Sequence, residues 1–181
     1  MRNVKYAEIV RVISDKSSVQ EGAVPYNISI ISNITINNLA NLINYYLLKR
    51  GLNPSIKLGD YDNVVQESYN QKHADLIIVH IDMIKIIENA GVFIEDLSEG
   101  SIKQLVDSTF SDIALIVNNL KHAPAVLFSS FTASGIYNDP LAVSNAKHIC
   151  QRLNDYLSGI ETTNMYLMDI GELITAVGLA Q

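Results

Sequence analysis

Apolar residues gather in five short runs with the length and the β-branched character of buried strands. The four clearest runs are Tyr26–Ile31, Ala74–Ile81, Pro124–Phe128 and Met165–Met168, and a shorter fifth run is Pro54–Leu58. Runs that are apolar at nearly every position are typical of strands covered on both faces in a parallel sheet. The pattern therefore predicts a five-stranded parallel sheet whose first and third strands along the chain are neighbours near its centre.

Segments of helical periodicity separate these runs, and a short amphipathic helix with a polar linker comes before the first strand. The predicted helices are Val4–Ile13, Ile36–Arg50, Ile102–Leu120, Leu141–Leu157 and Gly171–Leu179, and the linker is Ser14–Val24. Alternating strands and helices predict a three-layer α/β fold with an open parallel sheet. Right-handed crossovers favour the strand order 2-1-3-4-5 of flavodoxin-like folds. We thus expect an amino-terminal helix and linker over residues 1–25 and one α/β domain over residues 26–181.

Composition and charge exclude several classes of protein. The chain has 181 residues, of which 48% are hydrophobic, and a formal net charge of -6. This acidic balance argues against a nucleic-acid-binding groove, which needs clustered lysine and arginine. Charges interrupt every apolar stretch before it reaches membrane-spanning length, and the start does not resemble a signal peptide, so we expect a cytoplasmic protein without membrane partners. One cysteine, Cys150, and four scattered histidines predict no disulfide, no metal site and no cofactor.

The residues that follow the apolar runs are polar or glycine, and they are the candidate binding residues. In open parallel sheets the ligand crevice lies beyond the carboxyl ends of the strands. The predicted pocket therefore consists of Ser32, Asn33, Gly59, Asp60, Asp82, Ser129 and Ser130. The alternative is that these side chains only cap turns and the helices that follow.

The first strand end resembles the first sequence block of SGNH hydrolases, in which Gly-Asp-Ser-hydrophobic-Thr follows a strand. In ISIISNIT (Ile28–Thr35), Asn33 takes the place of the nucleophilic serine and Ser32 that of the aspartate. Gly59 corresponds to the glycine of the second block, whose backbone N–H would serve an oxyanion hole. Asp82 stands near the third block, which normally ends in Gly-x-Asn. The last block, Asp-x-x-His, has no counterpart, so the resemblance implies a site without nucleophile and base.

From Asn27 onward the chain also resembles the amino-terminal SGNH-like region of FkbH-type proteins. The similar stretches are ISNIT, NYYLLKRGLNPSIKLGDYDNVVQE, ADLIIVHIDM and NMYLMDIGELITAVGL. Proteins of this family carry a phosphatase-like HAD domain of subfamily IIIC behind that region, and they load glyceryl units from a phosphorylated donor onto acyl carrier proteins. The resemblance implies an acyl carrier protein or a HAD-type catalytic domain as partner. The family's catalytic aspartates lie in the HAD domain, so no catalytic role passes to residues of this chain.

A second motif, Asp60-x-Asp62-x-Val64, fits the nucleophile loop of HAD phosphatases. A HAD site also needs a later lysine and a paired-acid loop for Mg²⁺, and no acidic pair follows a later strand. We therefore interpret Asp60 as a cap of the following helix.

The leading hypothesis is a non-catalytic SGNH-like binding module. Its chief alternative is a divergent SGNH-type esterase or acyltransferase that uses Ser32 or Ser129. A flavodoxin-like nucleotide or receiver module is a third possibility, but the sequence lacks a phosphate-binding glycine run. His80 lies inside an apolar run, where it is either a satisfied buried histidine or a residue near the pocket.

Overall fold

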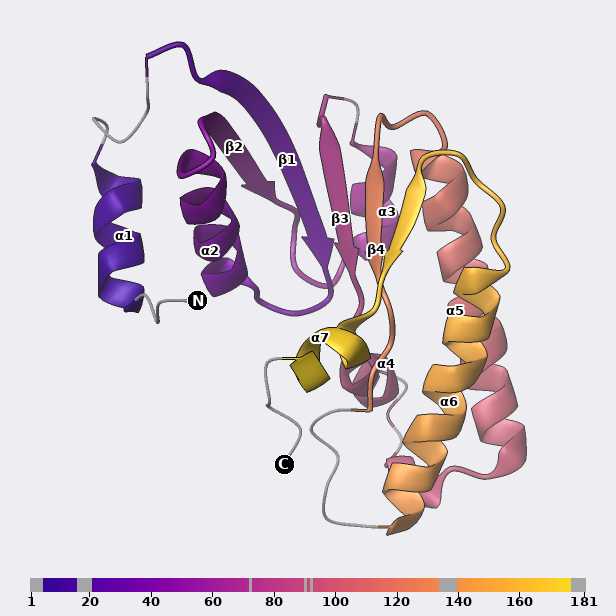
Figure 1. Ribbon diagram of the computed structural model, residues 1–181. Helices are drawn as coiled ribbons and strands as arrows, with labels where there is room; N and C mark the ends of the chain where they lie inside the picture. Colours follow the sequence, from indigo (N-terminus) through magenta and orange to yellow (C-terminus); the bar gives the residue numbers. More distant parts are fainter. Residues whose placement is uncertain are drawn as a thin grey trace.

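A five-stranded, all-parallel sheet forms the centre of the molecule (Figure 1). The structure is a computed structural model and describes residues 5–15, 21–71, 73–89, 91, 93–133 and 140–176. The strands run in the order β2-β1-β3-β4-β5, which confirms the predicted topology and the pairing of β1 with β3. Their bounds are β1 (Val24–Ser32), β2 (Leu52–Leu58), β3 (Leu76–His80), β4 (Val126–Ser129) and β5 (Met165–Met168).

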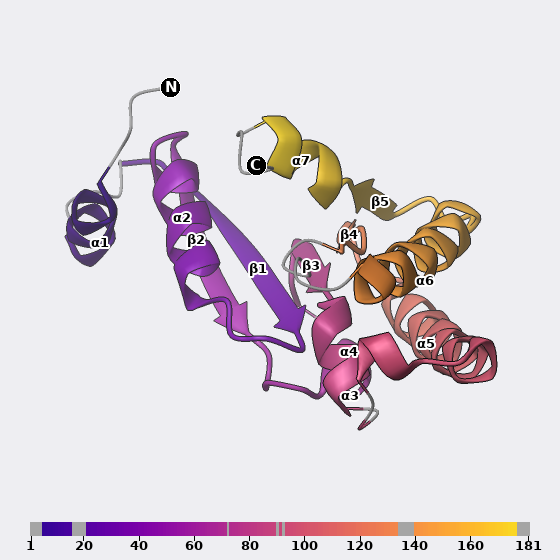
Figure 2. The same ribbon diagram turned by 90° about the horizontal axis from the view of Figure 1, so that it is seen from below.

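Helices cover both faces of the sheet (Figure 2). One face carries α2 over β1 and β2, with α1 packed on the outside of α2, and the other face carries α3, α5 and α6. The bounds are α1 (Tyr6–Ser14), α2 (Asn37–Leu48), α3 (Val64–Tyr69), α4 (Met83–Asn89), α5 (Glu99–Leu120), α6 (Pro140–Ser158) and α7 (Ile170–Ala176), with a 3₁₀ turn at Ile94–Asp96. The sequence did not predict α4 or the 3₁₀ turn. The end of the last predicted helix and the middle of the predicted linker lie outside the described residues.

Helix α2 ends two residues earlier than the predicted Arg50, so the basic pair Lys49-Arg50 lies beyond its last turn. Helix α2 ends at Leu48, and Gly51 has a φ of 78°. This left-handed conformation suits glycine, which has no Cβ to clash, so the chain can turn directly into β2.

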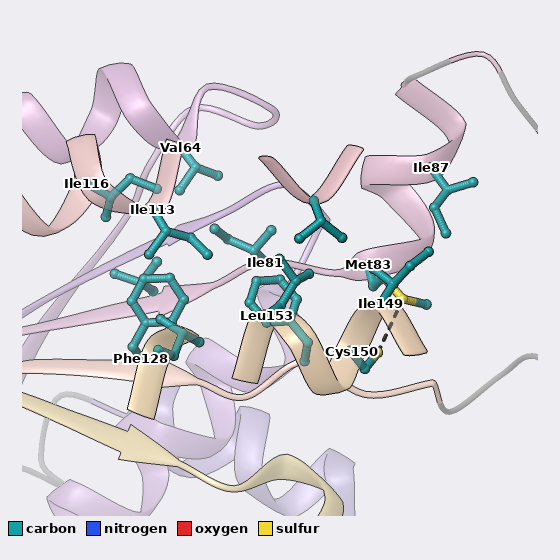
Figure 3. Close-up of a cluster of buried hydrophobic side chains, with 14 of the residues drawn as sticks. Val64, Ile81, Met83, Ile87, Ile113, Ile116, Phe128, Ile149, Cys150 and Leu153 are labelled. Carbon is teal, nitrogen blue, oxygen red and sulfur yellow. Dashed lines mark hydrogen bonds between the residues drawn. The ribbon is translucent and has the colours of Figure 1, made fainter. Parts of the chain in front are cut away.

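The larger hydrophobic core lies between the sheet and the helices α3 to α6 (Figure 3). Phe128 of β4 and Ile113 of α5 are fully buried in it. Cys150 is a free, buried thiol whose Sγ lies 3.2 Å from the Sδ of Met83. Burial raises the pKa of this thiol to about 12, so Cys150 stays protonated and acts as a packing residue.

A smaller core lies under α2, and the two edge strands are only partly covered. Ile28, Ile30 and Ile78 form the smaller cluster. On the edge strand β5, Tyr166 is 60% exposed and Leu167 is 41% exposed. Burial on both faces therefore holds for the central strands, whereas the edge strands β2 and β5 keep exposed positions because each has a neighbour on one side only.

Candidate functional site

The carboxyl ends of β1, β3 and β4 meet at one edge of the sheet, as the topology requires. The register pairs Ser32 with His80 and Val79 with Phe128, which brings Ser129 beside His80. Side chains alternate between the two faces of a strand, and Ser32 and His80 continue the face on which Ile30 pairs with Ile78. The predicted pocket residues therefore do not all lie on the same face of the sheet.

Asn33 joins the loop after β1 to the loop after β3. Its Oδ1 accepts a hydrogen bond from the N–H of Asp82 at 2.7 Å, and its Nδ2 donates to the carbonyl oxygen of Asp82 at 3.0 Å. The side chain is 5% exposed. The Asp82 carboxylate in turn accepts from the N–H of Lys85 at 3.1 Å, within the first turn of α4. Two predicted site residues thus form one clamp that fixes the neighbouring loops.

Ser32 and Ser130 stabilise turns at the same edge. The Oγ of Ser32 accepts from the N–H of Ile34 at 3.2 Å, and the Oγ of Ser130 accepts from the N–H of Ile170 at 2.9 Å. Both hydroxyls therefore cap local backbone, the second at the start of α7. These bonds match the capping alternative that the sequence left open.

Ser129 and His80 form a hydrogen-bonded pair across β3 and β4. The Nδ1 of His80 lies 2.8 Å from the Oγ of Ser129, whose side chain is 1% exposed. Burial lowers the pKa of His80, and the nearby charge of Asp82 partly opposes this effect. The imidazole is thus held neutral and satisfied. The sequence placed both residues at strand ends, but only the register of β3 and β4 shows that they touch.

The stability of the protein is expected to depend on pH through His80. A histidine whose pKa is lower in the folded state binds fewer protons than in the unfolded state, so its contribution is present above pH 6.5 and is lost as the pH falls below that value. Urea unfolding between pH 7.5 and 5 should show the decline in the wild type and a smaller decline in His80→Gln. Equal pH dependence in the two proteins would show that His80 is not the responsible group.

Gly59 and Asp60 do not have the roles that the sequence suggested. The N–H of Gly59 donates to the carbonyl oxygen of Ile30 at 2.9 Å. This hydrogen bond connects the end of β2 to β1, so the N–H does not serve an oxyanion hole. A Cβ at Gly59 would lie 3.0 Å from atoms of Ile31 and Glu67, so there is little room for a side chain at this position. Asp60 is exposed, and α3 begins after Asn63 without a side-chain cap. The predicted helix cap at Asp60 is therefore wrong.

A cavity of about 540 Å³ opens between α3, α4 and α5, beside the loops that follow β1, β2 and β3. Among the described lining residues, Asn33 alone belongs to the predicted pocket. Asp62 also lines it and has a φ of 67°, a conformation that aspartate tolerates in tight turns. The described lining residues are Asn33, Asp62, Asn63, Val64, Val65, Gln66, Ile81, Ile86, Leu105, Ser108, Thr109, Asp112 and Ile116.

The cavity has an apolar floor and a polar rim. Val64, Ile81 and Ile116 are buried, whereas Asp62 and Asp112 are exposed at the rim. Burial raises the pKa of Asp112, because partial removal from water penalises its charged form. The sequence did not predict that α5 lines the cavity. This helix comes near the strand ends only in the folded protein, and its polar residues have an ordinary helical pattern.

Two kinds of structure are absent from the described part of the chain. Histidine, cysteine and acidic side chains do not gather there in any group of three that could hold a metal ion. None of the described helices combines the length and the apolar character needed to cross a membrane.

One solved structure shares this fold across nearly the whole chain. It is the N-terminal part of the protein BF1531 from Bacteroides fragilis, described as containing a phosphatase domain and complexed with Mg. The TM-score is 0.74 at 14% sequence identity, and the match covers 97% of this chain and 47% of the other. The chain therefore spans about half the length of that solved fragment, and the likeness shows a common fold. No protein-family model matches the sequence, and a search of curated proteins found no relative.

Proposed function

We propose that this chain is a non-catalytic SGNH-like binding module, related to the amino-terminal domain of FkbH-type proteins. Its role is to hold an acyl group linked to a carrier protein, or to hold the carrier itself, next to a HAD-type catalytic domain. The group binds in the cavity between α3, α4 and α5, which Asn33 helps to line.

The observation that supports this proposal most is the pair of hydrogen bonds made by the Asn33 side chain. Where the resemblance to SGNH hydrolases would place a nucleophilic serine, this chain has an amide that bonds twice to the backbone of Asp82. An amide cannot be activated by a base as a hydroxyl can. Because the same amide fixes two loops at the cavity, this position serves the shape of a binding site.

The solved structure with the same fold supports the choice of partner. That solved fragment is described as containing a phosphatase domain, and this chain covers less than half of the fragment. A HAD-type phosphatase domain next to this module is the arrangement that the resemblance to FkbH-type proteins also implies.

The rival function is an esterase or acyltransferase that uses Ser129, and one contact favours it. The Nδ1 of His80 lies 2.8 Å from the Oγ of Ser129, which is the distance between a nucleophile and its base. Against it, the Ser129 side chain is 1% exposed, so an ester carbonyl has no path to the oxygen. The backbone N–H of the next residue, Ser130, donates to the carbonyl oxygen of Met168 at 2.8 Å and does not supply an oxyanion hole.

Ester hydrolysis separates the two functions. We expect the chain to hydrolyse nitrophenyl acetate and a simple acyl thioester no faster than buffer, and we expect Ser129→Ala and Ser32→Ala to leave this background unchanged. An assembled triad would raise the rate by several orders of magnitude. Turnover that disappears in Ser129→Ala but persists in the exposed-site control Ser111→Ala would replace the proposal with the esterase. Turnover lost only in Ser32→Ala would assign the nucleophile to Ser32.

A further inference from the structure

The two edge strands of the sheet differ in how their sequences protect them against pairing with another strand. An edge strand presents unpaired N–H and C=O groups, and proteins commonly block such a strand with proline or with charged side chains. Strand β2 contains Pro54 and the exposed Lys57. Strand β5 has the sequence Met-Tyr-Leu-Met, which contains neither a proline nor a charged residue.

The proline of β2 occupies a position that faces outward from the sheet. The N–H of Gly59 donates to the carbonyl oxygen of Ile30 in β1. Successive residues of a strand direct their backbone groups to opposite sides, so the backbone of Pro54 faces away from β1. Proline has no N–H to offer there, which is the position where edge strands tolerate it. Another strand therefore cannot pair fully with β2.

The backbone of β5, by contrast, can accept a further strand. The carbonyl oxygens of Asn164 and Met168 accept hydrogen bonds from N–H groups of the neighbouring β4 segment. By the same alternation, the N–H and C=O groups of Met165 and Leu167 point away from β4. Among the described strands, β4 alone pairs with β5 (Figure 1).

The side chains of β5 add apolar surface on both faces of the sheet. Tyr166 is in register with Leu127, which is in register with Ile78 of the smaller core, so Tyr166 lies on the face that carries α2. Helix α2 covers β1 and β2, and the Tyr166 side chain stays 60% exposed. Leu167 points to the other face and is 41% exposed.

The difference between the edge strands determines which partner fits. Pairing of β5 with β2 of another copy would need the strand that carries Pro54, and it would leave a free edge at each end for further growth. Pairing of β5 with β5 of a second copy avoids Pro54 and closes after two chains, because both copies use the same surface.

We propose that two copies of this chain pair antiparallel through β5, with the two-fold axis at Tyr166, so that their sheets become continuous. Met165 of each copy then pairs with Leu167 of the other through the outward N–H and C=O groups, and the two Tyr166 rings form an aromatic cross-strand pair. This register places Asp169 opposite Thr163, so like charges do not oppose each other although the chain is acidic. The dimer goes beyond the proposed function, and neither depends on the other.

Sedimentation velocity over a range of protein concentrations tests the dimer. Because β5 is short, we expect a weak dimer that forms at high concentration and dissociates on dilution. Tyr166→Lys puts two positive charges against each other at the axis and should raise the dimer Kd roughly tenfold or more. Tyr69→Lys makes the same change at a tyrosine that is 64% exposed on α3, and it should leave the Kd unchanged.

Disulfide formation tests the register. The two copies of residue 166 form a pair whose Cα atoms are about 4.5 Å apart in antiparallel sheets, within disulfide reach. Tyr166→Cys should therefore yield a covalent dimer under mild oxidation. Leu167→Cys and Tyr69→Cys should crosslink far more slowly, since the two copies of residue 167 are diagonal neighbours roughly 7–8 Å apart. Cys150 is buried and does not compete.

Three results would overturn the dimer. A chain that stays monomeric up to millimolar concentration would leave β5 free for a strand of a different protein. Equal association of Tyr166→Lys and Tyr69→Lys would place the contact elsewhere on the molecule. Crosslinking of Leu167→Cys as fast as that of Tyr166→Cys would contradict the two-fold axis at Tyr166.

Discussion

Replacing Phe128 with alanine is expected to lower the free energy of unfolding by about 3–5 kcal/mol. The ring is fully buried between the sheet and the helices behind it, among the side chains shown in Figure 3. Removing it takes away the free energy of transfer of a large apolar group and leaves a cavity that the neighbouring side chains fill only in part. Far-UV circular dichroism in urea measures the change, because the chain contains no tryptophan for fluorescence.

The matched control for this substitution is Phe93→Ala. Phe93 is 72% exposed, so its removal should change the free energy of unfolding by less than about 0.5 kcal/mol. A loss below about 1 kcal/mol in Phe128→Ala, or equal losses in the two variants, would show that the core does not lie where the structure places it.

Replacing Asn33 with leucine is expected to cost about 2–4 kcal/mol of stability, although the two side chains have the same branching and the same number of non-hydrogen atoms. Leucine leaves both the N–H and the carbonyl oxygen of Asp82 without their partner, and an unsatisfied buried polar group costs roughly 1–3 kcal/mol. Thermal unfolding measures the loss.

The exposed Asn70→Leu is the control for this second prediction, and it should leave stability nearly unchanged. If Asn33→Leu unfolds at the wild-type temperature, the clamp contributes nothing, and Asn33 would be free to act as a ligand contact at an open loop. That outcome would also remove the observation on which the proposed function depends.

The sequence predicted the central sheet because apolar runs and the rules of chain connection leave few choices. The run from Tyr26 to Ile31 is uninterrupted apart from Asn27 and Ser29, and its pairing with β3 follows from right-handed crossovers between successive parallel strands. The sequence failed at α4. This helix, Met83–Asn89, has seven residues and starts soon after β3 ends at His80, so its apolar residues continue the strand pattern and show no separate helical period.

The sequence predicted which residues lie at the strand ends, but not which of them contact one another. Asp82 and Asn33 were placed at the same edge, but their mutual hydrogen bonds depend on the exact register of β1 and β3. The contact of His80 with Ser129 depends on the register of β3 and β4 in the same way. A shift of one residue would turn either side chain to the opposite face, and apolar runs do not fix the register to one residue.

The sequence did not predict that α5 lines the cavity, and the reason is a different one. Asp112 is one of several polar residues on α5, and nothing in its local sequence separates it from Asp107. The difference is a matter of rotation about the helix axis, which carries Asp107 toward Arg152 and Asp112 toward the cavity. Only the packing of α5 against α3 distinguishes a residue that forms ion pairs from one that lines the cavity.

These contacts describe a strand-end edge whose polar groups mainly hold the protein together. Asn33 and Asp82 clamp two loops, Ser130 caps α7, and His80 is satisfied by Ser129. Among the described residues, these contacts leave open the cavity with its apolar floor and acidic rim. This arrangement is the one that the proposed non-catalytic binding module requires.

Native mass spectrometry of the chain mixed with an acyl-loaded acyl carrier protein tests the central claim most directly, since one spectrum reports binding and chemistry together. The account predicts a one-to-one complex whose mass is the sum of the two proteins with the thioester intact, and no change in the acyl mass over hours. A carrier that has lost its acyl group, or a chain that has gained it, would show catalysis. Absence of any complex with loaded carrier would show that the chain is not the binding module proposed here.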